Sequence, residues 1–211
     1  MKRWDVINRF IQKHGYTRYL EIGLNTGRNY EQVECADKES VDPAQERYAN
    51  ADPTYRMTSD EFFATVADAG KKTYDIIFID GLHEADQVDR DIVGALRCLA
   101  PGGTVMLHDC NPRDEARQIV PRIQTAWNGD VWKSAVRFRA GNRDYGCIVV
   151  DADEGLGIIR ADIDSDFRLT MPDTLTWGWL DTHRKKALGL VSKKKFVALF
   201  FPEEPPTDAS A

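Results

Sequence analysis

Short apolar runs alternate along the chain with stretches in which apolar residues recur at helical spacing. One run, residues 74–80 with the sequence YDIIFID, is continuously apolar from Ile76 to Ile79, as a strand covered by helices on both faces must be. The alternation is typical of a parallel sheet whose strands are joined by crossover helices. The predicted strands are residues 19–22, 40–42, 55–57, 74–80 and 104–108.

Helix signals fill the gaps between these strands. Thr58 and Glu61 form a capping-box pattern, and apolar residues at helical spacing follow up to Gly70, where we expect that helix to stop. The other predicted helices are residues 88–99, which end before Pro101, and residues 111–127, with a kink at Pro121.

The pattern changes in the last third of the chain. Residues 135–139 and 145–150 are predicted to form a terminal antiparallel hairpin. Beyond them the chain is acidic and weakly periodic, with helix-like stretches near residues 175–190 and 192–201. We therefore expect one domain over residues 1–150, a helical C-terminal extension over 151–201 that packs on it, and a disordered tail over 202–211.

Composition narrows the class of protein. With 42% apolar and 10% aromatic residues, the 211-residue chain can bury a sizeable core, which excludes wholesale disorder and a disulfide-dependent mini-fold. The formal charge is −6, and no basic block occurs apart from residues 193–195, so we expect neither a nucleic-acid nor a membrane partner. The four cysteines are widely spaced and no continuous apolar signal segment opens the sequence, which favours a cytoplasmic protein with free thiols.

The most informative segment is ExGxxxG, residues 21–27, where the first predicted strand passes into a helix. Gly23 and Gly27 let the backbone turn sharply and approach a ligand, but Asn25 stands where a pyrophosphate-binding GxGxxG loop has its second glycine. Asp42 closes the second strand, where a carboxylate can accept hydrogen bonds from both ribose hydroxyls of an adenosine. These features favour a nucleoside ligand without phosphates.

The order of the motifs carries a resemblance to a known family. ExGxxxG, VDP at 41–43, FIDG at 78–81 and LAPGG at 99–103 resemble a class I S-adenosylmethionine-dependent methyltransferase. FIDGLH, the downstream Asp91-Ile92 and HDCNP at 108–112 further resemble the bacterial methyltransferase family 24, many of whose members are O-methyltransferases. The resemblance implies an α/β fold: a Rossmann-like doubly wound sheet of seven strands, mostly parallel with an antiparallel terminal hairpin.

The resemblance also implies a set of cofactor contacts. Glu21 would meet the amino group of S-adenosylmethionine, Asp42 the ribose, and the residues after the third strand the adenine. For Ser59 and Asp60 a second interpretation stays open, because Ser59 can cap a helix and Asp60 can favour its N-terminus. The full set of predicted cofactor-binding residues is Glu21, Gly23, Asn25, Gly27, Asp42, Ser59, Asp60 and Asp80.

Titratable residues gather after the fourth and fifth predicted strands, where ligands bind in a doubly wound sheet. Asp80 and His83 follow one strand, and His108 and Asp109 close the next. We predict Asp80, His83 and Asp109 as the catalytic residues, with His83 as the general base, although a surface turn is the alternative for His83. Trp127 and Trp132 are candidates for the wall of an acceptor pocket, with a place in the core as the alternative for Trp132.

Asp80 and Asp109 are also candidate ligands for Mg or another divalent cation, because such ions prefer carboxylate oxygens and lower the pKa of a bound hydroxyl. Cation-dependent O-methyltransferases similarly place Asp after these two strands, but they follow the second Asp with Asn. Cys110 stands at that position here and is a poor ligand for Mg. The sequence leaves open whether Asp80 serves a metal, the next helix or the cofactor.

We therefore predict an S-adenosylmethionine-dependent methyltransferase that methylates an oxygen of a small molecule or sugar-containing metabolite. The expected partner is a small-molecule acceptor, and the sequence leaves a homo-oligomer open. The alternative from another class is a noncatalytic adenosyl-ligand-binding module, and a dehydrogenase ranks third. The methyl acceptor cannot be identified from the sequence, because specificity lies in loops that carry no code.

Overall fold

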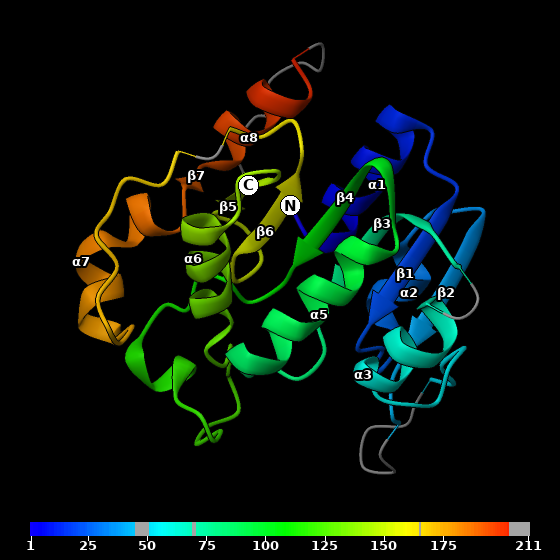
Figure 1. Ribbon diagram of the computed structural model, residues 1–211, viewed down its shortest axis with the longest axis horizontal. Helices are drawn as coiled ribbons and strands as arrows, with labels where there is room; N and C mark the ends of the chain where they lie inside the picture. The colour runs from blue at the N-terminus through cyan, green and yellow to red at the C-terminus, as the bar shows by residue number, and fades with distance from the viewer. Residues whose placement is uncertain (45–50, 69–70, 165, 203–211) are drawn as a thin grey trace.

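The computed structural model describes residues 1–44, 51–68, 71–164 and 166–202. Their strands form one seven-stranded sheet in the order β2-β1-β3-β4-β6-β5-β7 (Figure 1). In chain order the strands are β1 Arg18–Ile22, β2 Asp37–Val41, β3 Tyr74–Ile79, β4 Leu99–Leu107, β5 Gly146–Val150, β6 Leu156–Arg160 and β7 Leu190–Val191. Strand β6 is antiparallel to both its neighbours, β4 and β5, and the other pairings are parallel. The predicted fold class, a mostly parallel Rossmann-like sheet, is confirmed.

The register of the sheet brings the carboxyl ends of its four parallel strands to one edge. Ile22 at the end of β1 pairs with Val41 of β2 and with Ile79 of β3. Ile79 pairs in turn with Leu107 of β4. The residues that follow these strands therefore start from the same level, at the edge where open α/β sheets bind ligands.

Helices cover both faces of the sheet (Figure 1). Side chains alternate along β3, so that Ile77 and Ile79 belong to one hydrophobic cluster and Ile76 and Phe78 to the other. The first cluster includes α5 (Ala85–Arg97), α6 (Val131–Gly141) and α7 (Trp177–Ala187), and the second includes α1 (Arg3–His14) and α8 (Lys193–Phe200). The shorter segments are α2 (Arg28–Gln32), α3 (Ser59–Glu61), the π-helix η1 (Phe62–Ala67) and the 3₁₀ helix η2 (Glu115–Gln118). Within the described ranges, every helix is too short or too polar to cross a bilayer.

The capping box predicted before the first crossover helix is confirmed. The Thr58 hydroxyl accepts a hydrogen bond from the Glu61 amide at 3.2 Å, and the Glu61 carboxylate accepts one from the Thr58 amide at 2.9 Å. The next predicted helix, residues 88–99, corresponds to α5. Gly70, the expected helix end, and residues 203–211 of the expected tail lie outside the described residues.

The predicted strand at residues 55–57 is wrong. Tyr55 alone bridges Val41 of β2, through hydrogen bonds that join Tyr55 to the backbone of Ser40 and Asp42. The chain then turns at Thr58 into α3, so residues 56 and 57 do not extend this pairing into a strand. In the described residues β2 is therefore an edge strand with one bridging residue beside it.

The predicted helix over residues 111–127 is also wrong, because that segment is irregular apart from η2. Two carbonyls that would close helical turns bond elsewhere. The Arg117 carbonyl accepts the amides of Asn128 and Gly129 at 2.9 and 3.1 Å, and the Ile119 carbonyl accepts the Trp127 indole N–H at 2.7 Å. Pro121 supplies no amide for a continuous helix. The segment forms a loop that brings Trp127 and Asn128 back toward β4.

The terminal hairpin contains β5, but its other strand differs from the prediction. Residues 135–139 lie within α6, where Trp132, Ala135, Val136 and Arg139 are buried at helical spacing, so this short apolar run had the wrong period assigned to it. The partner of β5 is β6, reached through a tight turn in which Asp153 and Glu154 have positive φ. Strands β6 and β7 follow residue 150, so the expected domain boundary falls inside the sheet.

Candidate active site

A cavity of about 910 Å³ opens at the carboxyl ends of β1, β2, β3 and β4. Most of the predicted site residues line it: Glu21, Gly23, Asn25, Asp42, Ser59, Asp60, Asp80, His83 and Asp109. Gly27 does not, although Thr26 and Arg28 on either side of it do. His108 and Trp127 also line the cavity, whereas Trp132 is fully buried in the core. Residues from separate sequence motifs therefore line the same cavity.

The loop after β1 is held by backbone contacts and by one carboxylate. Gly23 has φ +90°, and a Cβ added there would lie 2.2 Å from the carbonyl oxygen of Asp80. Only glycine lets β1 and β3 end side by side at this point. Asp42 accepts the amides of Leu24 and Asn25 at 2.8 and 3.0 Å on one oxygen and that of Ala44 at 2.6 Å on the other. Asp42 thus shapes this loop whether or not it also holds a ribose.

Glu21 is buried in a polar group that the sequence did not predict. One oxygen of Glu21, which is 1% exposed, accepts hydrogen bonds from the Tyr19 hydroxyl at 2.5 Å and the Asn29 amide nitrogen at 2.9 Å. Burial raises the pKa of the Glu21 carboxyl to about 8. The side-chain oxygen of Asn29 is buried without a hydrogen-bond partner, and Asn29 lines the cavity. This corner of the cavity can therefore accept a hydrogen-bond donor from a ligand.

The residues after Thr58 surround a glutamine that sequence reasoning missed. The Gln87 side-chain amide donates to the Ser59 hydroxyl and to Asp60, both at 3.1 Å, and to buried Asp91 at 2.9 Å. Thr58, not Ser59, is the N-cap of α3, so the capping alternative for Ser59 is wrong. Asp60 also pairs with Arg90 at 3.2 Å on the surface. Ser59, Asp60 and Gln87 together present donors and acceptors to this end of the cavity.

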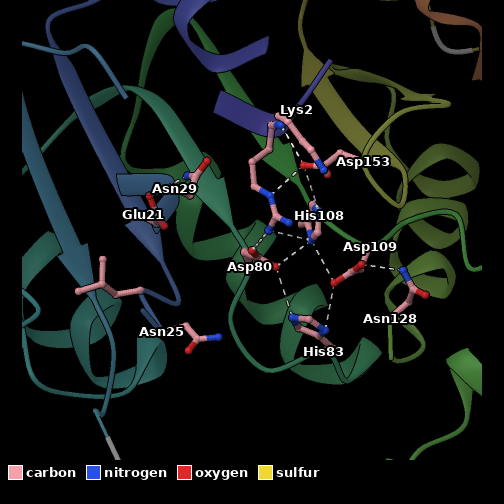
Figure 2. Close-up of polar contacts among 12 residues, drawn as sticks. Lys2, Glu21, Asn25, Asn29, Asp80, His83, His108, Asp109, Asn128 and Asp153 are labelled. Atoms are coloured by element: carbon pink, nitrogen blue, oxygen red, sulfur yellow. Dashed lines mark hydrogen bonds and ion pairs between the residues drawn. The ribbon is translucent and has the colours of Figure 1, made fainter. Parts of the chain in front are cut away.

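At the opposite end, two carboxylates and two imidazoles form what we call the acidic–histidine cluster: Asp80, His83, His108 and Asp109 (Figure 2). Nδ1 of His108 lies 3.1 Å from Asp80 and 3.0 Å from Asp109. His83 lies 3.3 Å from Asp80 through Nε2 and 3.2 Å from Asp109 through Nδ1. The other Asp109 oxygen accepts the Asn128 amide at 2.6 Å. Each carboxylate therefore faces both histidines.

The charges of the cluster stabilise one another. Burial alone would lower the pKa of His108, but the charges of Asp80 and Asp109 and their hydrogen bonds outweigh burial and raise it to about 10. Burial also opposes the rise at His83, where the hydrogen bond to Asp80 and the charge of Asp109 raise the pKa. For Asp80, burial favours the neutral acid, yet the histidines hold its pKa well below the ordinary range. At neutral pH, an ionised Asp80 therefore faces a protonated His108.

The backbone at the end of β4 is strained to build this cluster. Asp109 has φ +59°, which lies in the left-handed region that residues other than glycine rarely adopt. Such a residue costs about 1 kcal/mol and persists where its surroundings fix it. Here that conformation directs the carboxylate toward His83 and the cavity, and Asn128 holds it there.

The ring of His83 is fixed as well. It stacks on the indole of Trp127 with centroids 5.4 Å apart and planes 14° apart. Gly129 packs against the backbone and Cβ of His83, and the Asp130 amide donates to the His83 carbonyl at 3.1 Å. His83 is therefore not a free surface turn, because its side chain lines the cavity between Asp80 and Asp109.

A cation from the start of the chain reaches the same cluster. The guanidinium of Arg3 lies 2.6 Å from Asp80 and 3.3 Å from Nδ1 of His108. Its Nε and the Arg3 amide both donate to Asp153 at 3.0 Å, and Lys2 pairs with Asp153 at 3.1 Å. The sequence did not predict this contact, because Arg3 and Asp80 are far apart in the chain and no motif links them.

A divalent cation suits the donors of the cluster. Asp80, His83 and Asp109 each offer one ligand atom, and these atoms lie within 4.8 Å of one another. The two carboxylates are ligands that Mg and Mn prefer, whereas an imidazole is more usual for Zn, Fe or Ni. Cys110 takes no part: it is fully buried, and its thiol donates to the His108 carbonyl at 3.6 Å.

Known proteins share the fold. The O-methyltransferase TomG from Streptomyces achromogenes, involved in tomaymycin synthesis and solved with SAM, superposes with a TM-score of 0.55 at 14% identity, over 75% of this chain and 78% of that one. An O-methyltransferase from Bacillus cereus, solved with SAH, gives a TM-score of 0.53 at 14% identity, over 75% and 80%. Among curated protein sequences, none matches this chain.

The sheet and its strand order, with these likenesses, define the fold of a class I methyltransferase. Residues 6–110 match the family model described as a methyltransferase domain, that of methyltransferase family 24. The resemblance drawn from the motifs is therefore confirmed.

Proposed function

We propose that the protein transfers a methyl group from S-adenosylmethionine to a hydroxyl oxygen of a small molecule. One observation carries the proposal: a single cavity of about 910 Å³ joins the loop after β1 to the acidic–histidine cluster. That volume is near the upper end for small-molecule pockets and accommodates two ligands side by side. We call the part near Glu21, Asp42 and Ser59 the cofactor side, and the part near the acidic–histidine cluster the acceptor side.

The cofactor side offers partners for the ammonium group, the ribose and the adenine of S-adenosylmethionine. Glu21 and the unpartnered oxygen of Asn29 can accept the ammonium group, whose charge stabilises ionised Glu21. Asp42 lies at the end of β2, in reach of a ribose. Ser59 and Gln87 can hydrogen-bond the adenine edge. These buried or half-buried groups fit the cofactor, since each has acceptor or donor capacity directed into the cavity.

The acceptor side supplies proton transfer. When bound, the cofactor supplies an electrophilic methyl group, so the acceptor must lose its proton as the new bond forms. His83 in its neutral form takes that proton at Nε2, because Nδ1 is buried beside Asp109, and the two carboxylates stabilise the charged ring that results. Asp80 orients the imidazole, and the Asp109 carboxylate balances the positive charge that develops on it.

A divalent cation would add a second route to the same end. Asp80, His83 and Asp109 would hold the ion, which lowers the pKa of a hydroxyl next to it. His83 cannot be ligand and general base at once. Turnover that disappears in excess chelator and returns with Mg or Mn would assign the ligand role, and full turnover in chelator would leave His83 as the base.

Calorimetry and methyl transfer test the proposed function together. S-adenosylhomocysteine should bind with a dissociation constant in the micromolar range and NAD should not bind, because the loop after β1 lacks the pyrophosphate-binding glycine pattern. Transfer of a radiolabelled methyl group to a panel of phenols, sugars and hydroxy acids then identifies the acceptor. A protein that binds the cofactor product but methylates no hydroxyl compound would instead match the noncatalytic adenosyl-binding alternative.

A further inference from the structure

The side chain of Arg3 occupies a place beside the acceptor side that the proposed chemistry does not use. Its guanidinium nitrogen lies 2.6 Å from one oxygen of Asp80, and the other Asp80 oxygen faces His108 at 3.1 Å and His83 at 3.3 Å. Arg3 is 24% exposed and Asp80 16% exposed, so water screens the pair only in part. A fixed positive charge therefore lies against a carboxylate that would hold a divalent ion.

Three contacts anchor Arg3 from the far side. Its Nε and its backbone amide donate to the same oxygen of Asp153, and the Lys2 ammonium pairs with the other oxygen. Asp153 is 5% exposed and lies in the turn between β5 and β6, where its φ is positive. The start of α1 is thus tied to the turn between β5 and β6.

We propose that Arg3 is a resident cation of the acceptor side, on the Asp80 oxygen that His108 does not face, and that it competes with a divalent ion for Asp80. The ligand atoms of Asp80, His83 and Asp109 suit such an ion, but the ion must bind against the repulsion of the guanidinium. The inference rests on the proposed function for its catalytic meaning, because it decides whether the acceptor side is neutralised by the protein or by a metal. Arg3 acts through its charge on Asp80 and has no role in the methyl transfer itself.

Binding of Mn²⁺, followed by the loss of the free-ion signal in electron paramagnetic resonance, tests the proposal without an acceptor. Arg3→Gln should lower the Mn²⁺ dissociation constant about tenfold or more, because the repulsion at Asp80 is removed. Arg3→Lys retains the charge and should bind Mn²⁺ about as weakly as the wild type. Arg18→Gln is the matched control: it removes an arginine paired with Asp75 at 3.7 Å, outside the cavity lining, and should change nothing.

Two results would overturn the proposal. One is an Arg3→Gln variant that binds Mn²⁺ no more tightly than the wild type, including the case in which neither binds. The other is an Arg3→Lys variant that gains as much affinity as Arg3→Gln, since the loss of shape and not of charge would then be responsible. Circular dichroism establishes that each variant folds. Binding of S-adenosylhomocysteine is measured in parallel, and its absence in the wild type would contradict the proposed function, not the competition.

Discussion

The two sides of the cavity are built in opposite ways. The cofactor side consists of the loops after β1 and β2 and of the turn into α3, where side chains bond to backbone amides: Asp42 to those of Leu24 and Asn25, and Thr58 to that of Glu61. The acceptor side is assembled from distant parts of the chain, with Arg3, Asp80, Asp109 and Asp153 within one network. Local chemistry fixes the first side, and long-range charge pairing fixes the second.

This difference teaches what a substitution on each side should do. On the cofactor side, a substitution disturbs backbone geometry and should weaken cofactor binding or lower the stability of the fold. On the acceptor side, a substitution alters the charge balance of the acidic–histidine cluster and should lower the rate of methyl transfer. The following variants test that division, from the largest expected effect to the smallest.

Gly23→Val should abolish cofactor-product binding and lower the melting temperature. The new Cβ would lie 2.2 Å from the Asp80 carbonyl oxygen, so the ends of β1 and β3 must separate, and φ +90° is strained for valine. Calorimetry and thermal unfolding measure both effects. Gly102→Ala is a useful control, because Gly102 also has positive φ but no atom lies within 4 Å of an added Cβ. Normal binding by Gly23→Val would place the cofactor elsewhere.

His83→Ala should lower kcat by about 10²–10⁴-fold, the range for loss of a general base, and leave binding of S-adenosylhomocysteine nearly intact. A loss of kcat without a loss of affinity is what the division between the acceptor side and the cofactor side predicts. Single-turnover methyl transfer measures the first and calorimetry the second. Unchanged kcat on the identified acceptor would show that the His83 ring orients other groups and takes no proton.

Glu21→Gln should remove a pH dependence of stability. The native pKa of Glu21 is about 8, above its ordinary value of 4.5, so the native state holds a proton that the unfolded chain loses. The contribution is fully present below pH 4.5 and is lost as pH rises toward 8, by about 3–5 kcal/mol. Denaturant unfolding at pH 5 and pH 8 should show this loss in the wild type, with a clearly smaller one in the variant. Equal pH slopes would contradict a buried neutral Glu21.

Asp42→Ala should weaken S-adenosylhomocysteine binding by about 1.5–3 kcal/mol, the scale of hydrogen bonds to a charged group. Part of this loss comes from the ribose and part from the amides of Leu24 and Asn25, which lose their acceptor. Asp42→Asn keeps one acceptor oxygen and should fall between the wild type and Ala. Affinity that does not change in Asp42→Ala would reject the ribose assignment.

Much of the cofactor side could be predicted from the sequence, because its residues stand at fixed spacing from strand ends. ExGxxxG and Asp42 are local patterns, and parallel pairing alone brings them together. The same reasoning placed Asp80, His83 and Asp109 in one cavity. Gln87 and Asn29 were missed because a polar residue on a helix carries no sign of which face is buried until the helix is packed.

The acceptor side could be predicted only in part. Arg3 contacts Asp80 and Asp153 through pairings that no spacing rule links, so the sequence offered no signal for them. Residues 135–139 were assigned to a strand because a short apolar run fits both periods, and Val131 and Trp132, which precede the run, had to be included to show the helical one. Tertiary contact, not local pattern, decides such segments.

The left-handed backbone of Asp109 has a consequence for engineering this protein. Glycine adopts φ +59° without steric penalty, so a library selected for heat resistance would favour Asp109→Gly on conformational grounds alone. Such a variant would lose the carboxylate that faces His83 and Asn128. Glycine at this position would favour stability, whereas aspartate is needed for the chemistry. Asp109 should therefore be held fixed when the protein is engineered for thermostability.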